Sequence, residues 1–165
     1  MTNPLVTRGA VFDETGTYRY RLWREWDEGK CRVCFVLLNP SVADAERDDP
    51  TLRRCMGFAR AWGYGGLEVV NLFAFRATHP AKLKRAAHPV GPNNDRVICE
   101  AQERAALVVV GWGMHGNEDR VHAVYSLLSK PVCLGYTKQG HPRHPLYVPG
   151  TASPIPFARR ESCAR

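Results

Sequence analysis

Asn71 is the side chain of this sequence with the most specific chemistry. It lies inside an apolar run, where an amide without a hydrogen-bond partner costs about 1–3 kcal/mol. Either the fold or a ligand must therefore satisfy it. An amide presents a donor and an acceptor together, which is what recognition of a nucleobase edge needs. Asn71 is thus either a core amide that bridges to a loop or a base-recognising residue, and the sequence leaves both open.

Two further polar segments also follow apolar runs. Asn39 either caps the turn that Pro40 restrains at the end of a strand, or it holds a water or a ligand there. His144 lies in a loop with a proline on each side of it, and these prolines restrict the backbone, so that the imidazole is presented at a fixed angle. This loop favours a role in a site for His144.

The acidic residues and the cysteines do not indicate a metal centre. Helix capping and solvation explain Asp48 and Asp49. Cys31 and Cys34 have the spacing of a metal or redox pair, but they fall on an apparent strand and no second such pair follows. We therefore expect no metal and no cofactor. A hydrolase that pairs Asp44 with His144 is kept as a separate possibility.

Four continuous apolar runs must position these residues, at 31–38, 67–75, 107–111 and 132–136. Because the runs do not alternate with polar residues, they fit strands buried on both faces, as in a parallel sheet covered by helices. Helical spacing and capping residues predict helices over 49–63, 94–106 and 117–129. This order predicts an α/β fold, a three-layer sandwich around a mainly parallel four-stranded sheet.

Ligands of such a sheet bind outside the carboxyl ends of its strands. Asn39 follows the first run, Asn71 lies in the second, and His144 follows the fourth. We therefore expect Asn39, Asn71 and His144 to meet in one pocket at this edge of the sheet.

Residues 1–30 are expected to form an N-terminal extension packed on a single domain that spans 1–165. Residues 17–24 alternate aromatic or apolar side chains with cations, and this period of two predicts a strand. One face would carry Tyr18, Tyr20 and Leu22, and the other Arg19, Arg21 and Trp23. The segment is either a half-buried edge strand or a stacking and cationic surface for nucleic acid.

The composition is that of a compact domain with an excess of positive charge. The 165 residues are 44% hydrophobic, and 23 Lys and Arg against 16 Asp and Glu give a net charge of +7, which attracts polyanions. No apolar run approaches the roughly 20 residues of a membrane helix, and the first eight residues lack the pattern of a secretory signal. We expect a cytoplasmic monomer with no membrane partner.

Several motifs carry a resemblance to known families. The segments LNPSVAD (38–44), DDPT (48–51), VNLFAFRAT (70–78), PVG (89–91), WG (112–113) and HPL (144–146) resemble an uncharacterised bacterial and phage family known as a domain of unknown function. That resemblance runs over nearly the whole chain and implies no activity. The order of the motifs at the strand ends is similar, more distantly, to the uracil-DNA glycosylase superfamily, which implies a three-layer fold around four parallel strands.

The more distant resemblance also implies roles. In that superfamily an Asp or Asn before Pro positions or activates the attacking water, a place that Asn39 occupies here. An Asn on a middle strand recognises uracil and is followed by an Arg, as Asn71 is by Arg76. A His-Pro-Ser loop stabilises the leaving base and enters the minor groove; His144 and Leu146 resemble it, with Leu146 in the place of Ser. Phe73 is the nearest candidate for the ring that stacks on the base.

We therefore expect a nucleobase-recognising, nucleic-acid-binding protein, with DNA as its partner and a glycosylase-type, hydrolytic role in DNA repair. The rival is a noncatalytic module that binds a nucleotide or a nucleic acid. The expected catalytic residues are Asn39, Asp44 and His144. The expected base or ligand contacts are Pro40, Ser41, Asn71, Phe73 and Arg76. The expected nucleic-acid contacts are Lys138 and Arg143 on phosphates, with Leu146 and Tyr147 as wedges that flip the base.

Overall fold

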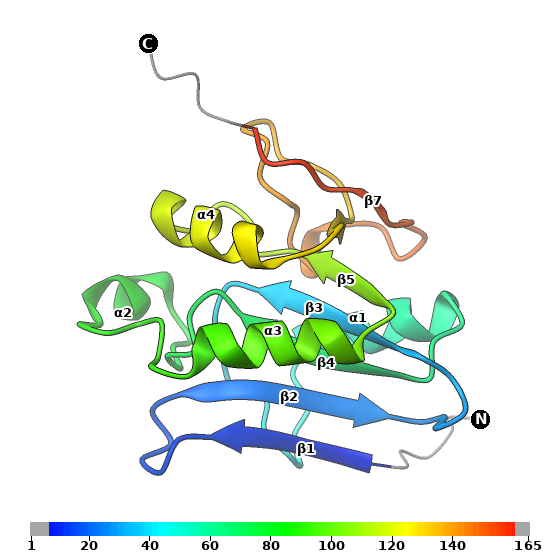
Figure 1. Ribbon diagram of the computed structural model, residues 1–165, viewed down its shortest axis with the longest axis horizontal. Helices are drawn as coiled ribbons and strands as arrows, with labels where there is room; N and C mark the ends of the chain where they lie inside the picture. Colours follow the sequence, from blue (N-terminus) through cyan, green and yellow to red (C-terminus); the bar gives the residue numbers. More distant parts are fainter. Residues whose placement is uncertain (1–6, 161–165) are drawn as a thin grey trace.

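The computed structural model describes residues 7–160 as a mixed α/β fold with helices on both faces of one sheet (Figure 1). The first six residues, part of the segment examined for a secretory signal, lie outside the described residues. The elements are β1 (Thr7–Phe12), β2 (Arg19–Glu25), β3 (Arg32–Leu37), α1 (Pro50–Ala61), β4 (Gly66–Asn71), α2 (Pro80–Arg85), α3 (Asn94–Arg104), β5 (Leu107–Val110), α4 (Glu118–Leu127), β6 (Val132–Cys133), the 3₁₀ turn η1 (Pro145–Tyr147) and β7 (Ile155–Pro156). Within residues 7–160, no helix has the length and apolar content needed to cross a membrane.

The sheet has seven strands in the order β1-β2-β4-β3-β5-β6-β7. The pairings β4-β3, β3-β5 and β5-β6 are parallel, whereas β1-β2, β2-β4 and β6-β7 are antiparallel. The prediction of a four-stranded sheet is therefore wrong in size and pairing, although the α/β class is confirmed. The four predicted apolar runs form β3 to β6, and segments with weaker patterns add β1, β2 and β7 at the two sides.

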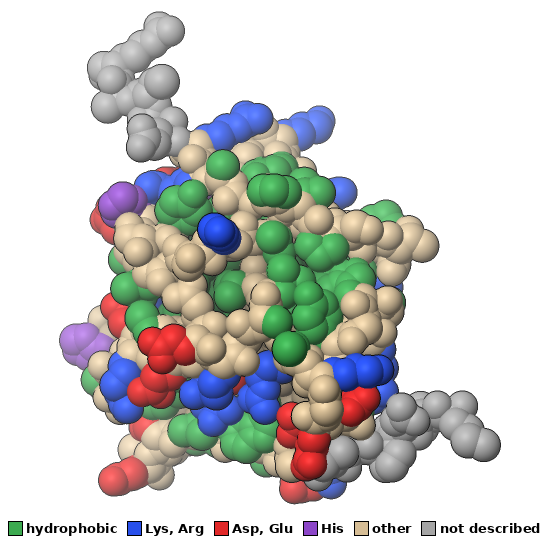
Figure 2. All heavy atoms as spheres, turned by 45° about the vertical axis from the view of Figure 1, so that its right-hand side comes forward, with side chains coloured by type: hydrophobic (Ala, Val, Ile, Leu, Met, Phe, Trp, Pro, Cys, Tyr) green, Lys and Arg blue, Asp and Glu red, His purple; other side chains and the backbone are tan. Residues whose placement is uncertain are grey.

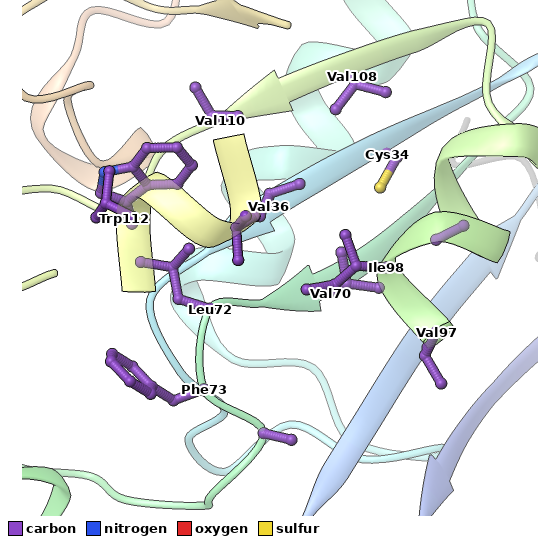
Figure 3. Packing of buried hydrophobic residues seen from close by; sticks show 14 of the residues in the cluster. Cys34, Val36, Val70, Leu72, Phe73, Val97, Ile98, Val108, Val110 and Trp112 are labelled. Atoms are coloured by element: carbon purple, nitrogen blue, oxygen red, sulfur yellow. The ribbon is translucent and has the colours of Figure 1, made fainter. Parts of the chain in front are cut away.

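Each face of the sheet has its own hydrophobic cluster. Alternate residues of β3, β4 and β5 meet α3 and α4 on one face, in front of the sheet in Figure 1, and the other residues meet α1 behind it. Figure 3 shows the first cluster, where Val36, Val70 and Val110 lie near Ile98 of α3 and Trp112. Because the parallel strands are covered on both faces, their sequences are mainly apolar without alternation, and Glu68 and Asn71 are the buried polar exceptions in β4.

The strand β2 departs from the predicted alternation. It is no edge strand, because β1 pairs with it on one side and β4 on the other. The register with β1 shifts so that Val11 pairs with Arg21 and the next residue, Phe12, with Arg19. Tyr20 is thus the extra residue of a β-bulge, which reverses the faces on either side of it. Tyr20 packs into the cluster beside α3, and Leu22 into the cluster beside α1.

Local capping explains the ends of the helices. The Asp49 side chain accepts a hydrogen bond of 2.8 Å from Leu52 N and Pro50 begins α1, while Gly63 follows that helix with a φ of 85°. Asn117 caps α4 by accepting from Arg120 N at 3.1 Å. The predicted α1, α3 and α4 are confirmed to within two residues at each end, whereas the six-residue α2 was not predicted.

A buried ion cluster links β2, β3, β4 and α3. Glu68 is fully buried on the α3 side of the sheet. Its carboxylate accepts hydrogen bonds from Arg21 Nε and Arg104 NH2, each at 2.6 Å, and from Arg32 NH1 at 3.3 Å. Burial alone would raise the pKa of Glu68, but the hydrogen bonds and charges of Arg104 and Arg21 outweigh it and hold that pKa below its usual value.

Candidate functional site

A pocket of about 590 Å³ opens at the carboxyl ends of the parallel strands. Its walls come from β2, from the ends of β3 and β4, from the loops that follow β3, β4, β5 and β6, and from the starts of α1 and α2. Asn39, Asn71 and His144 all line it, together with Ser41, Arg143, Leu146 and Tyr147 of the predicted site. Residues separated by more than a hundred positions therefore meet here because parallel strands end at the same edge.

Asn71 is the last residue of β4 and is 2% exposed. Its side-chain oxygen is buried and has no hydrogen-bond partner among the described residues. The backbone oxygen of Asn71 is satisfied separately, because Asn94 Nδ2 donates to it at 2.9 Å. The fold thus pairs the main chain at this position and leaves the buried amide oxygen of a pocket-lining residue without a partner among the described residues.

The loop that carries His144 is held against the ends of β5 and β6. Gly113 N donates to Pro142 O at 3.0 Å, and Arg143 N donates to Gly135 O at 2.9 Å. A Cβ on Gly111 would lie 3.1 Å from Pro145 Cδ, so glycine permits this close approach. From α1, Arg54 donates to Pro145 O at 3.3 Å and also to Val148 O.

His144 is held in one tautomer by its own loop. Its Nδ1 accepts from Leu146 N at 3.2 Å, so the proton of the neutral imidazole is on Nε2. Burial lowers the pKa of His144, and the negative charge of Asp49 opposes that shift. The Tyr147 ring, 74% exposed, has its centroid 5.7 Å from that of the imidazole. The pocket therefore contains a neutral donor beside an exposed aromatic ring.

Asp49 is the pocket carboxylate that the sequence analysis did not select. Capping was expected for Asp49 and is present, since Oδ1 accepts from Leu52 N. The same side chain lines the pocket, and its charge acts on His144. In the sequence, the only indication of a site role for Asp49 is its position after the Asn39 loop. Helix capping alone was enough to explain an aspartate at that position.

Asn39 lines the pocket, but its amide nitrogen also has a structural function. Nδ2 donates to Ala77 O at 2.8 Å and to Pro40 O at 3.0 Å. This joins the loop after β3 to the loop after β4, while a water or ligand held by Asn39 stays a prediction.

Arg19 is a second lining residue that the sequence analysis did not select for the site. It is 4% exposed, and NH1 donates to Ala43 O at 2.8 Å. The bulge at Tyr20 explains its place, because the reversal of faces turns Arg19 to the same side of the sheet as Leu22, which also lines the pocket. Period-two reasoning placed these two residues on opposite faces.

Five predicted site residues do not line this pocket. Phe73 is in the hydrophobic cluster beside Leu72, as Figure 3 shows, since β4 ends at Asn71 and the strand alternation stops there. Asp44 Oδ1 instead accepts from Glu46 N and Arg47 N at 2.9 and 2.7 Å, and these bonds hold the pKa of Asp44 below its usual value. Pro40 is buried, Lys138 is exposed in a turn, and Arg76 lies with its guanidinium 4.8 Å from the Phe12 ring. The rings at the pocket are Trp112 and Tyr147.

The surface and the metal-binding groups can be described for residues 7–160. In that range no group of three or more His, Cys, Asp or Glu side chains is arranged to hold a metal ion. On the face drawn in Figure 2, Lys and Arg alternate with Asp and Glu across the lower part, and hydrophobic side chains gather above them. The net positive charge is therefore mixed with acidic groups on this face rather than gathered into one basic surface.

A family described as "Protein of unknown function (DUF1643)" matches residues 19–146. No curated protein and no solved structure matches the chain. The matched range begins at Arg19 and ends at Leu146, so it contains every residue that lines the pocket except Tyr147.

Proposed function

The chain belongs to the family described as a protein of unknown function, DUF1643, and we propose that its pocket binds a nucleobase and hydrolyses the N-glycosidic bond of a modified or damaged base in DNA. One observation carries the proposal: the buried, unpaired amide oxygen of Asn71 shares a pocket with the carboxylate of Asp49 and the imidazole of His144. A volume of about 590 Å³ is within the range of small-molecule sites.

Base recognition rests on Asn71. The amide oxygen accepts from an amino or imino group of the base edge, and the amide nitrogen donates to a ring nitrogen or carbonyl oxygen. Trp112 also lines the pocket, and its Nε1 is a second buried donor without a partner among the described residues.

The hydrolytic step uses Asp49 and His144. A water molecule attacks the sugar carbon while the carboxylate of Asp49 accepts its proton, and the bond from that carbon to the base nitrogen breaks. The electron pair of the broken bond passes to the base, where a hydrogen bond from His144 Nε2 stabilises the charge on a base oxygen. The base then takes up a proton from solvent. Asp49 replaces Asn39 and Asp44 as the group that activates water, since the amide of Asn39 is not a base and Asp44 lies outside the pocket.

A DNA partner is supported by the rim of the pocket and by the net charge of +7. Arg143 is exposed at the rim, and Leu146 and Tyr147 are 41% and 74% exposed there. A cation beside two projecting apolar side chains fits a phosphate contact and a wedge that takes the place of a flipped base. The distant likeness to the uracil-DNA glycosylase superfamily remains a prediction that agrees with this arrangement.

The test is a panel of single-stranded and duplex oligonucleotides, each with one uracil, hypoxanthine, oxidised base or alkylated base. Cleavage of the product by alkali reports abasic sites. The wild-type chain and Asp44→Asn should form abasic sites, and Asp49→Asn should form at least about a hundredfold fewer. Asparagine caps helices well, so both variants retain their local hydrogen bonds and make a matched pair. Equal activity of the two variants would refute the assignment of Asp49.

The rival function is a noncatalytic module that binds a nucleotide or a nucleic acid. Two structural hydrogen bonds of Asn39 Nδ2 favour this rival. They give the residue at the water-activating position of the resemblance a structural role, which is to join two loops. Binding of DNA that weakens with added salt, without abasic sites on any member of the panel, would select this rival.

A further inference from the structure

Arg19 is a buried cation without a counter-ion at the pocket. It is 4% exposed, and its Nε has no hydrogen-bond partner among the described residues. No carboxylate of residues 7–160 forms an ion pair with it, whereas the neighbouring Arg24 is paired with Asp48 at 2.9 Å. A buried charge is costly unless it is paired, so this guanidinium lacks the partner that buried arginines normally have.

The charges around Arg19 do not supply that partner. Asp49 and Asp44 attract it at longer range, while Arg76 and Arg24 repel it. Burial lowers the pKa of Arg19 to about 10, because the charged form is poorly solvated. The guanidinium is still charged at neutral pH, and an anion in the pocket would compensate it.

Other residues that line the pocket could also bind an anion. Ser41 and Thr78 line the pocket, and their hydroxyl groups make no hydrogen bond within the described residues. Both also line an adjoining hollow of about 440 Å³ that contains Arg76 and Lys82. The pocket lining thus includes two hydroxyl groups and a buried guanidinium, and further cations line the adjoining hollow.

We propose that Arg19 binds a phosphate group of the ligand, so that the pocket takes a phosphorylated nucleotide unit with its base toward Asn71. A guanidinium presents parallel donors that match two phosphate oxygens. The inference rests on the proposed recognition of a base for the other end of the ligand. The phosphate belongs either to a free nucleotide or to a nucleic acid strand, and the experiment separates these sources.

The experiment compares ligands that differ only in the phosphate. Calorimetric titration of the wild-type chain with the common nucleosides and their 5′-monophosphates needs no variant. The same titrations are made on Arg19→Met, which keeps the length of the side chain, on Arg19→Lys, and on Arg96→Met as a control, since Arg96 is exposed on α3 and pairs only with Glu100. Inorganic phosphate and a short single-stranded oligonucleotide complete the ligands, with thermal unfolding as a second readout.

We expect a phosphorylated ligand to bind the wild-type chain at least about tenfold more tightly than its nucleoside. Arg19→Met should abolish that preference, Arg19→Lys should reduce it, and Arg96→Met should retain it. A preference for the monophosphate identifies a free nucleotide, and a preference confined to the oligonucleotide identifies a strand. If Arg19→Met does not fold, the proposal is tested by the comparison of ligands on the wild-type chain and by the phosphate preference of Arg19→Lys.

Three results would overturn the inference. They are nucleosides that bind as tightly as every phosphorylated ligand, the oligonucleotide included; an Arg19→Met or Arg19→Lys chain with the full phosphate preference; or no binding of any phosphorylated ligand. Inorganic phosphate that stabilises the wild-type chain and not Arg19→Met, without binding of any nucleoside, would support the phosphate site and refute base recognition. The two proposals can therefore fail separately.

Discussion

Replacement of Asn71 by Leu distinguishes a base-recognising amide from a core amide. The side chain is 2% exposed and its oxygen has no partner among the described residues, so the fold bears the cost of its desolvation without a compensating hydrogen bond. Leucine has a similar volume and no polar group. The two interpretations of Asn71 therefore predict opposite effects on stability.

The magnitudes follow from the hydrogen bonds. An unsatisfied buried amide costs about 1–3 kcal/mol, so Asn71→Leu should leave the free energy of unfolding unchanged or raise it by up to about 2 kcal/mol. Loss of the amide contacts to a base should weaken binding by about 1–3 kcal/mol, which is roughly five- to 150-fold. Asn71→Asp, which buries a charge when ionised, should lower both binding and stability.

Asn94 is the matched control. It is also buried, but its Nδ2 donates to Asn71 O at 2.9 Å and to Leu72 O at 3.1 Å. Its side-chain oxygen is buried and unpaired among the described residues, like that of Asn71, so the two leucine variants differ in the two bonds that Asn94→Leu loses. At roughly 1 kcal/mol each, the free energy of unfolding of Asn94→Leu should lie about 2 kcal/mol below that of Asn71→Leu. For a domain of this size that corresponds to a fall of about 4–8 °C in Tm.

The assay measures urea unfolding and ligand affinity on the same preparations of wild type, Asn71→Leu and Asn94→Leu. Stability retained with affinity lost in Asn71→Leu would support recognition by the amide. A fall of several kcal/mol in the stability of Asn71→Leu, with ligand preference intact, would show that Asn71 is a core residue, and the glycosylase-type mechanism would then be withdrawn.

Two further predictions concern titrating groups. Burial lowers the pKa of His144 in the folded chain, so the unfolded state binds more protons as the pH falls below 6.5, and the free energy of unfolding of the wild-type chain decreases. His144→Asn keeps an acceptor for Leu146 N, and its free energy of unfolding, measured in urea, should decrease less between about pH 7 and 5. An equal decrease in the variant and the wild type would contradict this cause. Glu68→Gln should lower the free energy of unfolding at pH 7 by about 3–5 kcal/mol, whereas the exposed Glu100→Gln should change it by less than about 1 kcal/mol. Because folding lowers the pKa of Glu68, the contribution of its carboxylate to stability is present above pH 4.5 and is lost as the pH falls through the folded-state pKa. The difference in free energy of unfolding between the wild type and Glu68→Gln should therefore shrink in acid, and a constant difference would refute this account.

The sequence alone was sufficient where structure depends on neighbouring residues. Continuous apolar runs predicted the four strands β3 to β6, since strands buried on both faces need apolar side chains at every position. Asp49, Pro50 and Gly63 predicted the ends of α1, because capping involves groups within a few residues of each other. The expectation that Asn39, Asn71 and His144 share one edge followed from the general rule for parallel strands.

The sizes of the sheet and of the pocket depended on contacts between distant segments. Pairing of β2 with β4 and the bulge at Tyr20 are properties of three strands together, and they brought Arg19 to the pocket. Because β4 ends at Asn71, the alternation of faces stops there, and Phe73 packs in the hydrophobic core. Asp49 had a sufficient local explanation as a cap, and only the approach of the His144 loop to α1 made the same carboxylate part of a site. Hydrogen bonds between strands and the packing of loops join residues far apart in the chain, so no local pattern in the sequence specifies them.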